Sequence, residues 1–170
     1  MKFFLDTEFY EDGTTIDLIS IALISETGTE FYAVSTEAKL HRVSAWVRKN
    51  VLPSLPNYGD SAWMTRAEIA SRMMMFVNSC SSPDAVKDKP EFWAYYADYD
   101  WVTLCQLFGT MMDLPSFFPK FCMDLKQLSV DVGSPKHSIS NGEHNALADA
   151  RWNRDLYQFL MNKKSQYVGG

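Results

Sequence analysis

The sequence predicts an α/β fold in which a mixed β-sheet is flanked by helices. Three apolar segments separated by short turns come first, which favours an antiparallel meander. Helical and strand patterns then alternate, an order typical of parallel strands joined by helices. The predicted element order is β-β-β-α-α-β-α-β-α. We expect one domain over residues 1–167 and a frayed tail at 168–170.

The first three strands are expected where runs of β-branched, leucine and aromatic residues are bounded by turn signals. Gly13 and Gly28 mark the two turns, because glycine adopts backbone conformations that other residues avoid. The expected strands cover residues 3–9, 16–24 and 29–34.

Two helices are predicted next. Residues 35–50 change to a helical period, and this helix is expected to stop before Pro53. Thr65 and Glu68 have the spacing of a capping box, so a second helix should begin there and end before Pro83.

The second half of the chain is expected to alternate strands and helices. Residues 91–97 are rich in aromatic residues and predict a strand buried on both faces, as parallel strands usually are. The remaining expected elements are a helix over 101–109, a short strand over 121–123, a helix capped by Asp124 and reaching Leu128, a polar loop over 133–142 and a final helix over 145–163.

The composition indicates a globular protein. Of 170 residues, 46% are hydrophobic, and no apolar run approaches the ~20 residues that span a bilayer. The first residues lead directly into a strand, and the three cysteines are far apart, so the cytoplasm is the expected location. The formal charge of −5 argues against nucleic-acid binding by bulk charge. Two bound divalent ions would bring it to −1 and reverse its sign locally.

Two pairs of acids follow the central strands. Asp6 and Glu8 are two positions apart in an apolar strand, so they point the same way, roughly 6–7 Å apart. Such a pair is costly unless a positive charge lies between them, and a divalent metal ion is the obvious candidate. Asp98 and Asp100 end the strand expected to run parallel to the first, and sites in open α/β sheets lie at such strand ends.

A third acid and a histidine stand at the start of the last helix. Asn145 can cap this helix, which leaves His144 in the loop before it and Asp149 in its first turn. On a continuous helix, residues five apart lie about 140° apart and would not share a face. With His144 in the loop, its imidazole can swing over the metal site while Asp149 points into it.

Three motifs, in this order along the chain, resemble those of the DEDDh 3′–5′ exonucleases of the ribonuclease-H-like fold, and most of all the short stand-alone exoribonucleases. They are Asp6-Thr7-Glu8, Tyr99-Asp100 and His144-Asn145-Ala146-Leu147-Ala148-Asp149. The histidine with four residues between it and the last aspartate marks the histidine subclass.

One position departs from the pattern of the family. Tyr96 stands where members often carry asparagine, four residues before the second-motif aspartate. Asp98 therefore stays open as a rival to Asp100. Asp98 is otherwise expected to be a turn or cap residue, as an isolated aspartate at a strand end usually is.

The resemblance implies two-metal hydrolysis of phosphodiester bonds from the 3′ end of single-stranded RNA or of a 3′ overhang. Asp6, Glu8, Asp100 and Asp149 would hold two Mg²⁺ or Mn²⁺ ions, and His144 would act as the general base. The alternatives are a 3′–5′ exodeoxyribonuclease and a non-catalytic domain of the same fold that binds nucleic acid or protein. The resemblance also makes a homodimer plausible.

Five further residues are candidates for substrate contacts. Phe9 and Tyr10 directly follow the metal strand and could stack on the terminal base, although core packing explains Phe9 equally well. Trp101 is a weaker candidate of the same kind. Lys136 and His137, in the polar loop, could touch phosphate.

Overall fold

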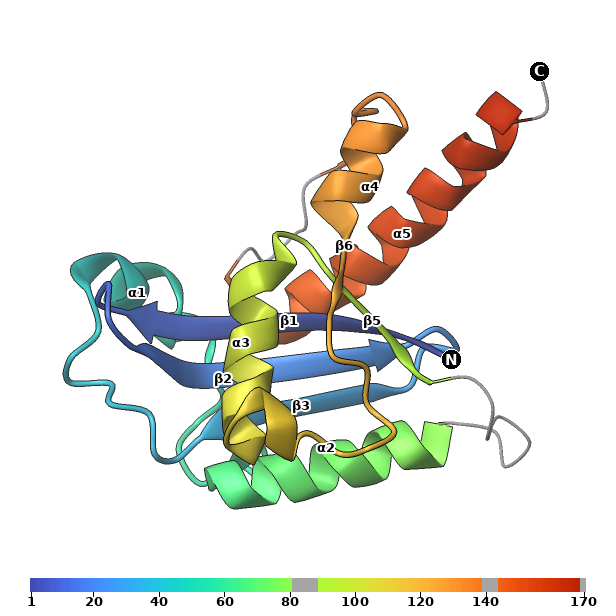
Figure 1. Cartoon of the computed structure of the whole chain (residues 1–170). Coiled ribbons are helices and arrows are strands. Elements are labelled where there is room, and N and C mark those ends of the chain that lie inside the picture. Colours follow the sequence, from blue (N-terminus) through green and yellow to red (C-terminus); the bar gives the residue numbers. More distant parts are fainter. Residues whose placement is uncertain (81–88, 139–143, 169–170) are drawn as a thin grey trace.

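The computed structural model describes residues 1–80, 89–138 and 144–168, and these residues form three layers (Figure 1). The middle layer is one sheet. Its strands lie in the order β4 (Trp63–Met64), β3 (Glu30–Ser35), β2 (Ile16–Ser25), β1 (Lys2–Glu11), β5 (Glu91–Ala94) and β6 (Met123–Asp124). The described helices are α1 (Ala45–Asn50), α2 (Arg66–Cys80), α3 (Ala97–Phe108), α4 (Leu125–Asp131) and α5 (Ala146–Val168), with 3₁₀ turns η1 (Leu52–Ser54) and η3 (Met111–Asp113).

The sheet is mixed, as the sequence predicts. β1, β2 and β3 form an antiparallel meander, and β5 and β6 run parallel to β1. β4 adds a short parallel pairing to β3 that the sequence analysis does not anticipate. The mixed sheet between helical layers is consistent with a ribonuclease-H-like fold.

Alternation along β1 divides its side chains between the two helical layers. Phe3 and Leu5 pack in the cluster formed with α2 and α3, while Phe4 packs in the cluster formed with α4 and α5. Because side chains alternate along a strand, Asp6 and Glu8 continue the face of Phe4. The candidate acids therefore face the start of α5.

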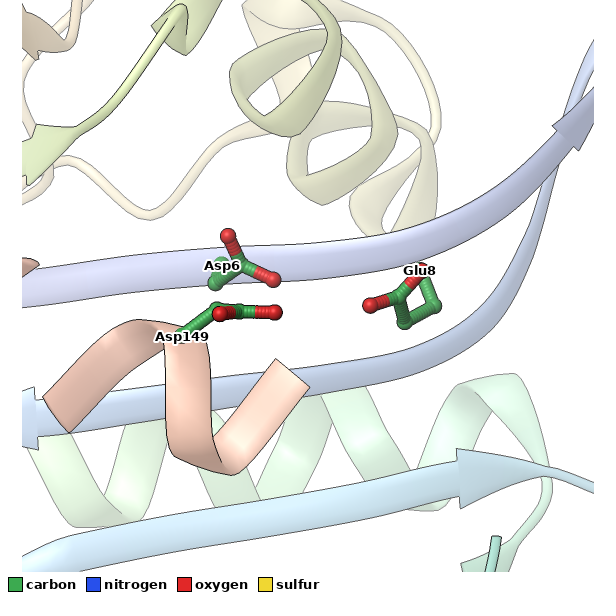
Figure 2. A group of neighbouring side chains, drawn as sticks. All are labelled: Asp6, Glu8 and Asp149. Atoms are coloured by element: carbon green, nitrogen blue, oxygen red, sulfur yellow. The ribbon is translucent and has the colours of Figure 1, made fainter. Parts of the chain in front are cut away.

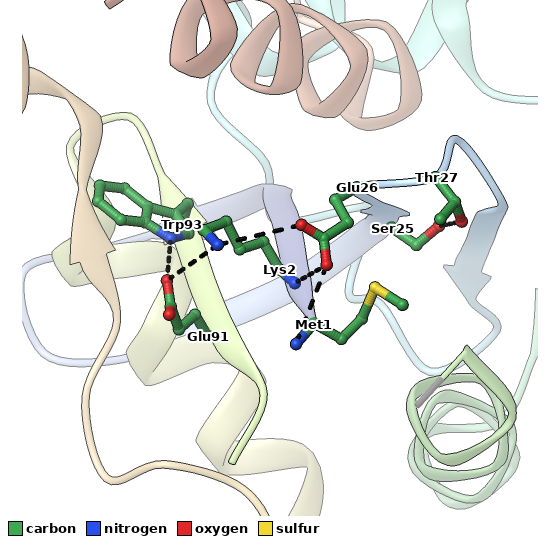
Figure 3. Close-up of polar contacts among 7 residues, drawn as sticks. All are labelled: Met1, Lys2, Ser25, Glu26, Thr27, Glu91 and Trp93. Atoms are coloured by element: carbon green, nitrogen blue, oxygen red, sulfur yellow. Dashed lines mark hydrogen bonds and ion pairs between the residues drawn. The ribbon is translucent and has the colours of Figure 1, made fainter. Parts of the chain in front are cut away.

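The beginning of β1 is held by polar contacts on both sides (Figure 3). The Lys2 backbone N–H donates to Glu26 Oε1 at 3.2 Å, and the Lys2 ammonium lies 4.0 Å from both Glu26 and Glu91. Trp93 Nε1 donates to Glu91 Oε2 at 3.2 Å. Partly exposed ion pairs contribute little stability, so the buried aromatic residues below them carry most of this packing.

The first helix is shorter than predicted. Only Ala45–Asn50 is helical, and residues 36–43 form turns and irregular segments instead of the first part of a helix. Ser44 explains the late start, because its hydroxyl accepts a hydrogen bond from the Val47 N–H and caps the helix. The apolar spacing that suggested a longer helix arises because Val43 and Leu40 pack beside Ile19 from the preceding turns.

The expected strand over 91–97 is also too long. β5 ends at Ala94, Tyr96 adopts a left-handed conformation with φ of 57°, and α3 begins at Ala97. The Ala97 N–H donates to Asp124 Oδ2 at 2.8 Å, which stabilises this early helix start. Asp98 and Asp100 therefore lie in the first turn of α3 and not at a strand end.

Several cap predictions are confirmed. Thr65 and Glu68 exchange hydrogen bonds as a capping box, and Asp124 Oδ1 accepts from Gln127 N–H at the start of α4. Asn145 Oδ1 accepts from Ala148 N–H at the start of α5. α5 continues to Val168, so the predicted tail at 168–170 overlaps the helix by one residue. Residues 139–142 of the predicted polar loop lie outside the described residues. No helix in the described parts is both long and apolar enough to cross a bilayer.

Candidate metal centre

Three carboxylates converge where β1 passes the first turn of α5 (Figure 2). Asp6, Glu8 and Asp149 each offer one oxygen, and these oxygens all lie within 4.8 Å of one another. Two oxygens on opposite sides of one Mg²⁺ ion are about 4.2 Å apart, because each lies about 2.1 Å from the metal. Neighbouring oxygens on such an ion are about 3.0 Å apart, so the three side chains would move toward one another on binding a hard divalent cation. Their all-oxygen donors suit Mg²⁺ or Mn²⁺.

The electrostatics of these acids also fit a cation. Burial, then the charges of Asp100, Asp149 and Glu8, hold the pKa of Asp6 well above its usual range. Burial and the charges of Asp149 and Asp100 raise the pKa of Glu8 to about 8. Acids in this situation keep protons near neutral pH unless a positive charge stabilises the ionised forms. Such shifts mark functional sites often enough to support the assignment made from geometry.

Asp100 lies beside this group but uses one oxygen elsewhere. Its Oδ1 accepts hydrogen bonds from Thr7 N–H at 2.7 Å and from Thr7 Oγ1–H at 2.6 Å. Burial raises the pKa of Asp100 to about 7, against the lowering effect of the Thr7 bonds. The charge of Asp100 acts on both Asp6 and Glu8, whereas the neighbouring Asp98 is exposed. Of the two rival aspartates, Asp100 is the one that is buried and whose charge acts on Asp6 and Glu8.

His144 precedes α5 in the loop, as expected, and its backbone is firmly held. Its φ of 69° lies in the left-handed region, which is uncommon for residues other than glycine. The His144 N–H donates to Asp149 Oδ2 at 2.9 Å, and Ser54 Oγ–H donates to the His144 carbonyl at 3.0 Å. The half-buried imidazole packs edge-on against Trp46, with ring centroids 4.6 Å apart.

The start of α5 is joined to η1 by a second contact. Asn145 Nδ2 donates to the Ser54 carbonyl at 3.2 Å, while the Asn145 N–H donates to Asp149 Oδ2 at 3.3 Å. Asp149 thus accepts from two backbone amides ahead of its own helix. These bonds, together with those of Ser54, orient the Asp149 carboxylate toward β1.

The two aromatic residues after the acids have different surroundings. Phe9 stacks almost parallel on Tyr99 of α3, with centroids 5.4 Å apart and an interplanar angle of 3°. Phe9 is half-buried and Tyr99 is half exposed, so the stacked pair forms an accessible aromatic surface next to Glu8 and Asp100. Tyr10 is partly buried and packs with Ile19 and its neighbours.

Trp101 is placed differently from the expectation for a substrate contact. Its side chain is 9% exposed and packs against Phe92 in the core between the sheet and α3. The residue lies one position after Asp100 on a helix, so it points about 100° away from that acid. Trp101 is therefore a core residue, and the expectation that it contacts the substrate is wrong.

Lys136 is exposed in the loop before α5, and His137 packs on that helix. The His137 ring lies over Phe159, with centroids 4.8 Å apart. Phe159 is ten residues beyond Asp149, or roughly 15 Å along the helix at 1.5 Å per residue. His137 is therefore remote from the converging carboxylates and could reach only a more distant phosphate.

Several residues of this region were not singled out from the sequence. Asn153 donates from Nδ2 to the Leu5 carbonyl at 2.8 Å, one helical turn after Asp149, and that spacing could have indicated it. Ser20 lies opposite Glu8 in the sheet, and its hydroxyl is buried. Trp46, Ser54 and Thr7 carry no comparable sequence signal, because their roles depend on packing between distant segments.

Comparisons with known proteins identify the family. Residues 1–161 match the model described as the 3′-5′ exoribonuclease Rv2179c-like domain. Two relatives from Mycobacterium tuberculosis are 3′-5′ exoribonuclease Rv2179c of strain ATCC 25618 / H37Rv and 3′-5′ exoribonuclease MT2234.1 of strain CDC 1551 / Oshkosh. Each is 43% identical over 152 residues, which cover 89% of this chain and 88% of the relative. The chain belongs to the 3′-5′ exoribonuclease Rv2179c-like family.

Proposed function

We propose that the chain is a metal-dependent 3′–5′ exoribonuclease of the DEDDh type. The observation that carries this proposal is the convergence of oxygens from Asp6, Glu8 and Asp149 within 4.8 Å, in surroundings that raise the pKa of two of these acids. The relatives named as 3′-5′ exoribonucleases support RNA as the substrate and the 3′ end as the point of attack. Single-stranded RNA or a 3′ overhang is the substrate class proposed.

The proposed cofactor is a pair of Mg²⁺ or Mn²⁺ ions. When bound, two such ions stabilise the charge that develops on the attacking and leaving oxygens of the phosphodiester. Asp6, Glu8 and Asp149 hold the ions, and Asp100 adds its second oxygen, since Thr7 occupies only Oδ1. The Thr7 bonds keep that second oxygen in a defined orientation.

His144 is the proposed general base. Its imidazole would accept the proton of the attacking water, the role that histidine most often has in general acid–base catalysis. The bonds from His144 N–H to Asp149 and from Ser54 to the His144 carbonyl hold its backbone beside the acids. The Trp46 contact restricts the ring.

The terminal base is proposed to stack on the Phe9–Tyr99 surface. Stacking accepts any base, which suits an enzyme that removes nucleotides in succession. Phe9 directly follows Glu8, and Tyr99 directly precedes Asp100. A base stacked on these rings would therefore keep its phosphate near the carboxylates. Tyr10, Lys136 and His137 are assigned no part in the chemical step.

The test is hydrolysis of 5′-labelled single-stranded RNA and of the matched DNA strand, each with Mg²⁺ or Mn²⁺. We expect RNA ladders shortened from the 3′ end, abolished by chelation and by Asp6→Ala. Asp100→Asn should remove activity, whereas Asp98→Asn, an exposed neighbour on the same turn, should retain it and serves as the control.

Two outcomes would replace the proposal. Faster cleavage of DNA would indicate an exodeoxyribonuclease. RNA binding that survives chelation without any cleavage would indicate a non-catalytic binding domain. Light scattering of the same preparation tests the proposed homodimer, whose mass would be twice the 19.5 kDa of the chain.

A further inference from the structure

Asn153 is a buried polar residue on the face of α5 that meets the sheet. Its side chain is 1% exposed, and Nδ2 donates to the backbone carbonyl of Leu5 at 2.8 Å. The other buried positions of this helix are apolar. They are Ala146, Ala150, Leu156 and Leu160.

The Leu5 carbonyl lies on an edge of β1 that no strand of the described residues covers. β5 pairs with β1 only from Lys2 to Phe4, and the Met1 carbonyl accepts the Glu91 N–H at the start of this pairing. Backbone groups alternate sides along a strand, so those of Leu5 point to the same side as those of Met1, beyond the last residue of the β1–β5 pairing. Asn153 supplies the donor that a longer β5 would have supplied.

This hydrogen bond connects neighbours of two proposed metal ligands. Leu5 directly precedes Asp6 on β1, and Asn153 follows Asp149 by four residues on α5, so Asn153 and Asp149 share one helical face. A shift of α5 along β1 would change the Asp6–Asp149 separation and would break the bond to Leu5. The bond therefore fixes the relative position of the helix and the strand next to the carboxylates.

The Asn153 side-chain amide has only one of its two polar atoms in a hydrogen bond among the residues described. Because a carbonyl needs a donor, Nδ2 must face Leu5, and Oδ1 is then buried without a partner among the residues described. A buried acceptor that lacks a donor is unfavourable, and an apolar side chain would avoid it. Asn153 is nevertheless an asparagine on a helix face whose other buried residues are alanine and leucine.

We propose that Asn153 is a positioning residue for the metal centre. Its bond to Leu5 holds Asp149 at the separation from Asp6 and Glu8 at which the three oxygens can share a cation. This inference rests on the proposed function and deepens it. A residue that merely stabilises the fold would affect unfolding without affecting metal affinity.

The test compares Mn²⁺ binding with stability in three variants. Asn153→Leu removes the amide but keeps the branched shape of the side chain, and Asn153→Ala removes the amide by truncation. Leu156→Ala truncates another buried side chain of the same helix. Isothermal titration with Mn²⁺ alone gives the affinity, and thermal unfolding without metal gives the stability. We expect both Asn153 variants to bind Mn²⁺ about 10- to 100-fold more weakly than wild type, as for other residues that orient metal ligands.

Leu156→Ala is the matched control. It should unfold at a lower temperature than wild type but bind Mn²⁺ with wild-type affinity. Equal affinity in wild type and both Asn153 variants, or equal weakening in Leu156→Ala, would overturn the positioning role alone. Wild-type protein that does not bind Mn²⁺ would overturn the proposed metal centre and this inference together.

Discussion

A single oxygen of Asp100 accepts two hydrogen bonds from Thr7, at 2.7 Å from the backbone nitrogen and at 2.6 Å from Oγ1. Thr7 is the residue between Asp6 and Glu8, and its side chain points to the opposite face of the sheet. α3 is thereby attached to β1 between the two proposed ligands of that strand. The two bonds fix the orientation of the Asp100 carboxylate beside the proposed metal centre.

Thr7→Val should weaken this attachment. The substitution removes the Oγ1 donor at nearly the same volume, and a hydrogen bond to a charged group contributes about 1.5–3 kcal/mol. The pKa of Asp100 should rise above its value of about 7, because a bond that lowers it is lost. Denaturant unfolding measures the loss of stability.

Thr103→Val is the control for this variant. Thr103 is buried on α3, and its Oγ1 donates to the neutral Tyr99 carbonyl at 2.7 Å. Thr103→Val should lower the free energy of unfolding by less than Thr7→Val does, about 0.5–1.5 kcal/mol. It should leave the Mn²⁺ affinity unchanged. Equal losses and equal metal affinities in the two variants would show that the Thr7–Asp100 bonds do not serve the metal centre.

The stability of the metal-free protein should fall as pH rises from about 5 to 8. The pKa values of Asp100 and Glu8 are raised to about 7 and about 8, from about 4 in the unfolded chain. The folded state therefore binds more protons than the unfolded state in this range. For each extra proton, the free energy of unfolding falls by up to about 1.4 kcal/mol per unit of rising pH. Thermal unfolding with chelator at several pH values tests the direction.

Glu8→Gln should raise the stability of the metal-free protein at pH 8, because it removes one charge from a crowded group of acids. The same variant should lose most of the stabilisation that Mn²⁺ gives to wild type, since one ligand is missing. Asp98→Asn, which changes an exposed carboxylate, should do neither. A metal-free Glu8→Gln protein that is less stable than wild type at pH 8 would contradict the proposed repulsion.

His144→Asn should reduce hydrolysis by about 10²- to 10⁴-fold, the usual contribution of a general base. Asparagine tolerates the left-handed backbone at φ of 69° better than alanine does, so the fold should be preserved. Steady-state rates of RNA hydrolysis, measured beside the unfolding temperature of each variant, test this expectation. His137→Asn, remote from the acids, should keep the wild-type rate, and a comparable loss there would argue against a specific role of His144.

Tyr99→Ala should weaken RNA binding by about 1–3 kcal/mol, the usual contribution of one stacked base. Tyr99 is 50% exposed, so its truncation should change stability little. The measurement is the dissociation constant of RNA in an Asp6→Asn background. Tyr58→Ala removes an exposed tyrosine that packs on Trp63 instead, and should leave RNA affinity unchanged.

Local periodicity was sufficient for part of the fold and of the site. The facing of Asp6 and Glu8 follows from the two-residue repeat of a strand, and the loop position of His144 follows from the cap formed by Asn145. The antiparallel meander followed from the short turns between its strands. Each of these depends on residues that are close in sequence.

Other features depend on contacts between distant segments. α3 begins at Ala97 because Asp124, 27 positions further on, accepts its N–H, so Asp98 and Asp100 occupy a helical turn that the aromatic strand pattern concealed. Trp101 is next to Asp100 in the sequence and was a candidate for substrate contact, but it packs on Phe92 in the core. No local pattern contains that information.

The sequence by itself determined the mixed sheet and the common facing of Asp6 and Glu8, because chain order and side-chain period are local properties. Only the tertiary structure decided how these groups are held. Thr7 with Asp100 and Asn153 with Leu5 occupy the edge of β1 that β5 leaves uncovered, and Ser54 holds His144. Hydrogen bonds between segments 90 to 148 residues apart leave no periodic trace in the chain.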